Sequence, residues 1–176
     1  MAKKTIYDLY QMKARGERVA WITAYDAPTA ACAQAAGIDM LLVGDSLGMC
    51  VLGLEGTVPV TMEQCLHHTR AVRNGAPQTF VIGDMPFLSY QVSTEEAVLN
   101  AGRFLKEAGA DAIKLEGGQR VTRQIRAITE AGIVVFGHIG LTPQSSGQLG
   151  GFKAQGRTVE AARVMIDDAL AVQEAG

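Results

Sequence analysis

Residues 40–46 read Met-Leu-Leu-Val-Gly-Asp-Ser, an apolar run that ends in two polar side chains. The arrangement recurs at residues 80–84 (Phe-Val-Ile-Gly-Asp), 112–116 (Ala-Ile-Lys-Leu-Glu) and 133–138 (Ile-Val-Val-Phe-Gly-His). Runs this short and apolar are typical of strands buried on both faces of a parallel sheet. In parallel α/β folds, side chains just past the carboxyl ends of strands line the ligand site. These runs therefore indicate both the fold class and the place of the site.

The segments between these runs have helical patterns. Glycine is predicted to end each helix in the left-handed conformation, in the pairs Ala36-Gly37, Asn74-Gly75, Ala108-Gly109, Ala131-Gly132 and Ala175-Gly176. Thr61 with Gln64, and Ser93 with Glu96, have the spacing of capping boxes. The last segment has an apolar stripe at helical spacing, formed by Val159, Ala162, Ile166, Ala169 and Leu170.

An opening helix over residues 6–14 and a first strand over residues 19–23 complete a pattern of five β-α units. This pattern predicts a parallel sheet with right-handed crossovers. A doubly wound sheet and a (β/α)8 barrel both fit. The barrel is favoured because polar residues follow nearly every strand and no G-x-G-x-x-G follows the first. A barrel has eight units and usually ~250 residues, so we expect residues 1–176 to form a single barrel domain that is incomplete at its C-terminal end.

The composition excludes several classes of protein. The 176 residues are 48% hydrophobic and 19% charged, with a net charge of −2 and no basic stripe, so nucleic acid and anionic membranes are not expected partners. No apolar run approaches the ~20 residues of a membrane span, and the start at Met1 lacks a signal peptide's apolar region. Cys32, Cys50 and Cys65 are predicted to be buried, reduced thiols of a cytoplasmic protein.

Two aspartates are the first candidates for a metal site. Asp45 and Asp84 each follow a glycine at the end of neighbouring strands. Either one alone is commonly a helix cap or turn residue. Together they predict oxygen ligands converging at one edge, a donor set that suits Mg²⁺. Zn²⁺ is disfavoured because it prefers Cys and His ligands.

Three further polar side chains are predicted at the same edge. Lys114 and Glu116 share a strand face because side chains alternate with period 2. They either form a plain salt bridge or contact an anionic substrate and the metal. His138 ends the next strand and is either a structural loop histidine or part of the site. Ser46 has no histidine base placed beside it, so we expect it to bind a substrate carboxylate rather than act as a nucleophile.

These residues lie in strings that resemble the ketopantoate hydroxymethyltransferase family. The resemblance covers nearly the whole chain, in order. The matching strings are residues 23–26 (TAYD), 43–49 (VGDSLGM), 83–87 (GDMPF), 114–118 (KLEGG), 137–144 (GHIGLTPQ) and 150–157 (GGFKAQGR).

The resemblance implies a pyruvate/phosphoenolpyruvate-type (β/α)8 TIM barrel. It also implies transfer of a hydroxymethyl group from 5,10-methylenetetrahydrofolate to 3-methyl-2-oxobutanoate, giving 2-dehydropantoate on the route to pantothenate and coenzyme A. Mg²⁺ would be bound by Asp45 and Asp84, with Glu116 completing the site directly or through water. The residues implied in substrate binding are Asp45, Ser46, Asp84, Lys114 and His138. Keto acid and folate are the expected small-molecule partners, in a homo-oligomer.

One family feature has no counterpart in this sequence. The family's proton-abstracting base is a glutamate on the sixth strand, beyond Gly176, so no catalytic base is assigned here. Two alternatives to the transferase therefore stay open. One is a Mg²⁺-dependent C–C lyase of the same superfamily, which would act without folate. The other is a catalytically incomplete fragment that at most binds metal and keto acid.

Overall fold

The computed structural model describes residues 3–176. Met1 and Ala2, the first residues of the segment for which no signal peptide is predicted, lie outside the described residues. The strands are β1 (Trp21–Thr23), β2 (Met40–Val43), β3 (Phe80–Asp84), β4 (Ala112–Glu116) and β5 (Val134–His138). The helices are α1 (Ile6–Ala14), α2 (Ala27–Ala35), α3 (Leu47–Cys50), α4 (Met62–Gly75), α5 (Thr94–Ala108), α6 (Thr122–Glu130), α7 (Ser146–Leu149) and α8 (Val159–Ala175), with short 3-10 turns η1 (Gln119–Val121) and η2 (Pro143–Ser145).

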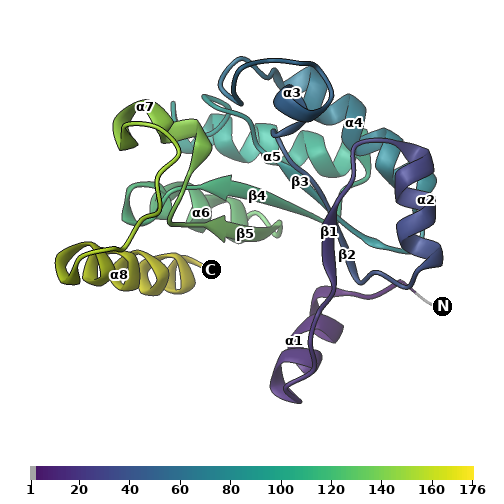
Figure 1. Cartoon of the computed structure of the whole chain (residues 1–176). Coiled ribbons are helices and arrows are strands. Elements are labelled where there is room, and N and C mark those ends of the chain that lie inside the picture. The colour runs from purple at the N-terminus through teal and green to yellow at the C-terminus, as the bar shows by residue number, and fades with distance from the viewer. Residues whose placement is uncertain (1–2) are drawn as a thin grey trace.

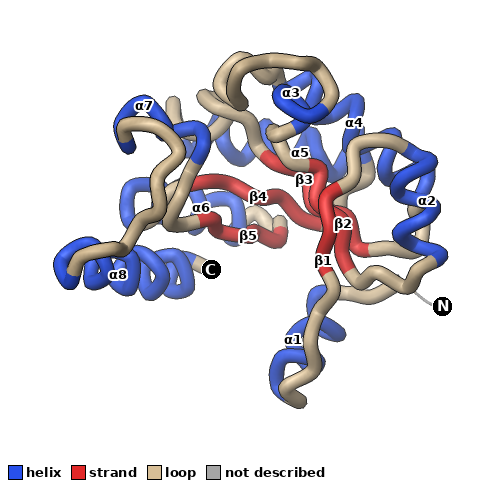
Figure 2. Tube along the Cα trace, viewed as in Figure 1, coloured by secondary structure: helices blue, strands red, loops and turns tan. Residues whose placement is uncertain are grey.

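The strands form one parallel sheet in the order β1-β2-β3-β4-β5. Figure 2 shows them as a curved row with β1 and β5 at its two ends. A doubly wound sheet needs a reversal of strand order, and none occurs among residues 3–176. The unbroken order is that of successive units of a (β/α)8 barrel, which confirms the predicted fold class.

The two faces of the sheet are covered differently. One face carries Leu41, Val81 and Ile113, which are fully buried, and α2, α4, α5 and α6 pack over it. The other face, with Phe80 and Ile82, packs against α1. In Figure 1, α1 lies below the sheet, apart from α2 and α4. Period-2 alternation thus directs every second side chain toward the barrel interior.

The predicted helix ends are mostly confirmed. Thr61 and Gln64 form a reciprocal capping box, whereas Ser93 only accepts a hydrogen bond from the Glu96 N–H. Gly109 has φ 70°, as expected of a left-handed helix end. Gly75 is the last residue of α4, so the helix ends where predicted, but this glycine does not adopt the left-handed conformation. A Cβ there would lie 2.1 Å from the Ala27 carbonyl oxygen, so the glycine permits close packing of α4 on α2.

Two predictions about burial are also wrong. Cys32 and Cys50 are exposed, and Cys65 alone among the three is buried. The predicted apolar stripe of α8 faces outward, with Ile166 60% exposed, because this helix packs through Val172 and Ala175 instead. The reason in both cases is tertiary, since helical periodicity does not determine which stripe meets a neighbour. Within residues 3–176, no helix combines the length and apolar character needed to span a membrane.

Candidate functional site

The carboxyl ends of β2, β3, β4 and β5 bring the predicted polar residues together. Asp84 pairs in register with Lys114, and Glu116 with His138. Asp45 follows β2, and its backbone N–H donates to Asp84 Oδ2 at 3.0 Å. The expected convergence of Asp45 and Asp84 at one edge of the sheet is therefore present.

Lys114 is the central cation of this group. Its ammonium nitrogen lies 2.7 Å and 2.8 Å from the two Asp84 oxygens and 3.3 Å from Glu116 Oε1. The side chain is only 9% exposed. Burial alone would lower the pKa of Lys114, but the charges of Asp84 and Glu116 outweigh it and raise this pKa above its ordinary value. The lysine therefore stays charged at neutral pH.

Glu116 is held from three sides. It accepts hydrogen bonds from Lys114, from the Gln144 backbone N–H at 3.1 Å, and it lies 3.2 Å from His138 Nδ1. Burial would raise the pKa of Glu116, but the His138 hydrogen bond and the Lys114 charge reverse this and lower it. His138 itself has a side chain that is 35% exposed, so the imidazole borders both Glu116 and solvent.

Asp45 differs from the other two carboxylates. Burial and the neighbouring charge of Asp84 raise the pKa of Asp45 to about 7. Its Oδ2 accepts a hydrogen bond from Gln144 Nε2 at 2.8 Å. No side chain or backbone N–H among residues 3–176 donates to Oδ1. Asp45 thus has a free oxygen, and no lysine among residues 3–176 forms an ion pair with it.

Ser46 lies beside these carboxylates at the start of α3. Its hydroxyl oxygen is 2.7 Å from the hydroxyl of Tyr25. Neither histidine nor another base contacts this hydroxyl among the described residues. The environment agrees with a binding role and offers no means to activate Ser46 as a nucleophile.

Sequence reasoning assigned no role to two residues of the site, Tyr90 and Gln144. Tyr90 is buried, and its hydroxyl contacts both the backbone N–H and the carbonyl of Glu116. Gln144 bridges Asp45 and Glu116, as described above. In the sequence, Thr142-Pro143-Gln144 stands out only as part of the family resemblance. No local pattern shows that its glutamine reaches a strand end so distant in sequence.

The carboxylates of the site suit a divalent cation in their number and chemistry. They are not already arranged around one point as metal ligands. Asp45, Asp84 and Glu116 are buried carboxylates with one buried lysine among them, an excess of negative charge that a divalent cation would balance. Within residues 3–176, no three acidic, cysteine or histidine side chains are arranged as a ready metal-binding group. The Lys114 ammonium explains this, because it lies between Asp84 and Glu116. The assignment of Asp45, Asp84 and Glu116 as ligands remains a prediction.

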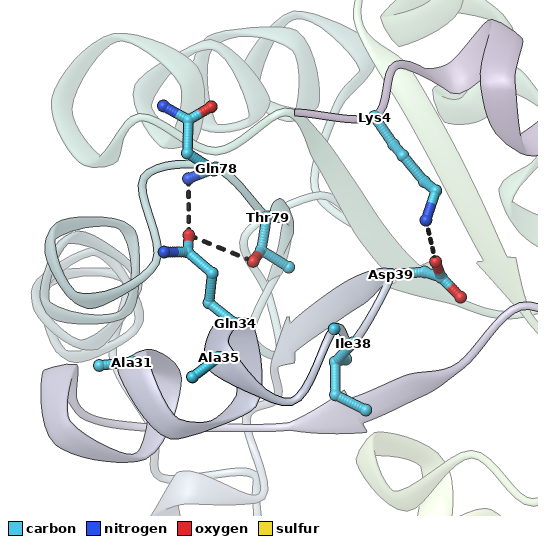
Figure 3. Close-up of a pocket in the computed structure, with 9 residues that line it drawn as sticks. Lys4, Ala31, Gln34, Ala35, Ile38, Asp39, Gln78 and Thr79 are labelled. Carbon is cyan, nitrogen blue, oxygen red and sulfur yellow. Dashed lines mark hydrogen bonds and ion pairs between the residues drawn. The ribbon is translucent and has the colours of Figure 1, made fainter. Parts of the chain in front are cut away.

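Two cavities lie at opposite edges of the sheet. A cavity of about 240 Å³ borders Glu116 and is lined in part by Tyr90, Arg120 and Gln148. A larger one, of about 480 Å³, lies at the opposite, N-terminal edge of the sheet (Figure 3). There Gln34 accepts from the Gln78 N–H at 2.7 Å, and Lys4 pairs with Asp39. The polar groups at that edge bond to one another, which agrees with a structural role for the N-terminal edge of the sheet.

The sequence and the fold both have close counterparts among known proteins. The family model described as ketopantoate hydroxymethyltransferase matches residues 3–176. The chain is 71% identical over 174 residues to the 3-methyl-2-oxobutanoate hydroxymethyltransferase of Alkaliphilus metalliredigens, and 56% identical over 173 residues to that of a Geobacillus species. These matches cover 99% and 98% of this chain. The chain spans only 62% of the length of either relative.

Solved structures support the barrel architecture. A 2,3-dimethylmalate lyase of the PEP mutase/isocitrate lyase superfamily matches with a TM-score of 0.72 at 16% identity, over 100% of this chain and 60% of that one. A phosphonopyruvate hydrolase in complex with oxalate and Mg²⁺ matches with a TM-score of 0.71 at 17% identity, over 98% of this chain and 61% of that one. At such identities the likeness establishes the fold alone. The match of the family model to residues 3–176 places this chain in the ketopantoate hydroxymethyltransferase family.

Proposed function

We propose that this chain forms the metal- and keto-acid-binding part of a cytoplasmic hydroxymethyltransferase. The reaction transfers a one-carbon unit from 5,10-methylenetetrahydrofolate to 3-methyl-2-oxobutanoate, giving 2-dehydropantoate for pantothenate and coenzyme A biosynthesis. The observation that carries the proposal is the buried Lys114 held between Asp84 and Glu116 beside Asp45. The names of relatives up to 71% identical support the choice of substrates.

The proposed roles follow from the surroundings of each side chain. Asp45 and Asp84 would hold Mg²⁺, with Glu116 directly or through a water molecule. When bound, Mg²⁺ supplies a Lewis acid that makes the C–H bond beside a keto group more acidic. A phosphonopyruvate hydrolase of similar fold has been solved in complex with oxalate and Mg²⁺, which supports the proposal of a metal beside a small carboxylate ligand.

The remaining residues would bind and orient the keto acid. The Ser46 hydroxyl would donate to the substrate carboxylate, and Lys114 would place positive charge where negative charge develops on the keto oxygen. His138 would border that oxygen. The C3 carbon loses its proton and bonds to the methylene carbon of the folate. Both C–N bonds of that carbon break, water supplies its hydroxyl, and the two folate nitrogens take up the proton from C3 and the proton from water as tetrahydrofolate leaves. By resemblance, the base that takes the proton lies beyond Gly176. We also propose assembly into a homo-oligomer.

An activity assay of two proteins tests the proposal. One is this chain, and the other is the same chain extended with the remaining third of the Alkaliphilus metalliredigens relative. NMR would follow 2-dehydropantoate formation from keto acid, methylenetetrahydrofolate and MgCl₂. We expect product from the extended chain, and a loss of about a hundredfold or more in kcat for its Lys114→Met variant, because a preorganised charge is removed.

The same assay separates the alternatives. Cleavage of 2,3-dimethylmalate without folate by the extended chain would support the lyase and overturn the transferase. No product from either substrate set would also overturn the transferase. Product from the extended chain with none from the 176-residue chain would show that residues 1–176 are a catalytically incomplete part of an active transferase.

A further inference from the structure

The side chain of Gln144 uses its whole hydrogen-bonding capacity inside the site. Its Nε2 donates to Asp45 Oδ2 at 2.8 Å and to the Met85 carbonyl oxygen at 2.9 Å. Its Oε1 accepts from the Tyr90 hydroxyl at 2.8 Å and from Gln91 Nε2 at 3.3 Å. The residue is 5% exposed, so these protein groups replace water as its partners.

These partners determine which way the amide points. The Met85 carbonyl can only accept a hydrogen bond, so the amide atom that faces it must be the nitrogen. The same nitrogen therefore faces Asp45. A flipped amide would set two oxygens against each other at both Met85 and Asp45. The donor at Asp45 Oδ2 is consequently a fixed part of the site.

This donor makes the two oxygens of Asp45 unequal. Oδ2 is engaged by Gln144, while Oδ1 receives no donor from residues 3–176. A cation approaching Asp45 therefore meets one free oxygen rather than a symmetric carboxylate. Mg²⁺ requires near-octahedral coordination and takes single carboxylate oxygens readily, whereas Ca²⁺ accepts bidentate carboxylates and more ligands.

We propose that Gln144 is a positioning residue that holds Asp45 as a one-oxygen ligand and thereby favours Mg²⁺ over Ca²⁺. The inference rests on the metal role of Asp45 in the proposed function. Gln144 also donates its backbone N–H to Glu116, so the segment after β5 contacts two carboxylates of the site, Asp45 and Glu116. Partners of metal ligands typically change metal affinity by 10–100-fold when removed.

Calorimetric titration of the 176-residue chain with MgCl₂ and, separately, CaCl₂ tests the proposal without any activity assay. In Gln144→Met, whose side chain has similar length and no amide, we expect Mg²⁺ affinity to fall by about tenfold or more. The ratio of Ca²⁺ to Mg²⁺ affinity should rise, because Oδ2 becomes free for bidentate binding. Gln148→Met is the matched control, since Gln148 is exposed and its side chain bonds only Arg120 within residues 3–176.

A second variant covers the case in which Gln144→Met does not fold, which circular dichroism would show. Tyr90→Phe keeps Gln144 but removes the hydroxyl that donates to its Oε1 and that also contacts the Glu116 backbone, and we expect a loss of Mg²⁺ affinity of about threefold. The inference is overturned if Gln144→Met folds and keeps the parent's Mg²⁺ affinity and Ca²⁺/Mg²⁺ ratio. If Tyr90→Phe is the only variant that folds, the same result in that variant overturns it. A parent chain that binds no Mg²⁺ also overturns it, while the transferase proposal then stands or falls on the extended chain.

Discussion

The strands at the centre of the sheet are more deeply buried than the strands at its two ends. Every residue of β3 and β4 is buried, and helices cover their outer face. All of β1 is exposed, β5 is only half-buried, and α8 leaves Ile166 and Leu170 more than half exposed. The same type of β-α unit therefore has a complete core in the middle of the sheet and an incomplete one at its ends.

This difference separates the region whose packing stabilises the fold from the strands and the helix that stay exposed. Central packing depends on close pairs such as Gly83 and Phe104, which leave no free volume. The site spans the two kinds of region, because Asp84 and Lys114 lie on central strands and His138 on the end strand β5. The substitutions below test the contrast in order of expected effect.

Removing the Phe104 ring should have the largest effect. Phe104 is fully buried in the main core, so Phe104→Ala should reduce the free energy of unfolding by about 3–5 kcal/mol. Urea unfolding followed by circular dichroism measures the change. Leu99→Ala is the control, since Leu99 lies on the same helix with 71% exposure. Equal losses in the two variants would contradict the contrast between buried and exposed positions.

Asp39 attaches the exposed strand β1 to the central sheet. Its carboxylate accepts from the Ala20 N–H at 2.7 Å and pairs with Lys4. Burial would raise the pKa of Asp39, but these two hydrogen bonds outweigh it and lower the pKa. Asp39→Asn should therefore destabilise the protein by about 1.5–3 kcal/mol at pH 7.

The pH dependence of this effect has a definite sign. A folded-state pKa below the unfolded one means that the carboxylate stabilises the fold above the unfolded pKa of about 3.9. That contribution disappears as pH falls through the folded pKa. Urea unfolding of parent and Asp39→Asn between pH 7 and pH 2 should show the two stabilities converging in acid. A difference that stays constant with pH would show that the charge of Asp39 is not what matters.

Gly83→Ala tests close packing directly. The added Cβ would lie 2.2 Å from a ring carbon of Phe104, so we expect a loss of about 1–3 kcal/mol from overpacking. Thermal unfolding measures it. Gly102→Ala on α5 is the matched control, because nothing lies within 4 Å of its added Cβ and alanine favours a helix. In a Phe104→Ala background, Gly83→Ala should cost less stability, because the ring that the new methyl group would clash with is absent.

The smallest effect is expected at the end of the sheet. Leu170 is 53% exposed on α8, so Leu170→Ala should change stability by no more than about 0.5 kcal/mol in this chain. The same substitution in the extended chain should cost about 2–5 kcal/mol if added units bury this side chain. Urea unfolding of both pairs provides the comparison. Identical small changes in both would show that the outer stripe of α8 stays exposed in the longer protein.

Much of the fold could be predicted from local sequence patterns. The apolar runs at β2, β3, β4 and β5 were located because buried parallel strands have a distinctive composition. Period-2 alternation predicted that Lys114 and Glu116 share a face. The positions of Asp45 and Asp84 after neighbouring strands predicted that they meet at one edge, and the structure has both arrangements. At Gly75 the pattern predicts the end of α4 but not its conformation, because in sequence a glycine that admits a neighbouring backbone resembles one in the left-handed region.

The sequence by itself determined the order of the β-α units and the strand-end carboxylates, because each depends on residues adjacent in the chain. It favoured the barrel, and the strand order β1-β2-β3-β4-β5 decided between the barrel and a doubly wound sheet. Only the tertiary structure decided which stripe of α8 packs and which residue orients Asp45. Gln144 lies 99 positions from Asp45, and the path of the segment after β5 brings them together. No local periodicity encodes such a contact, since it depends on how distant segments pack.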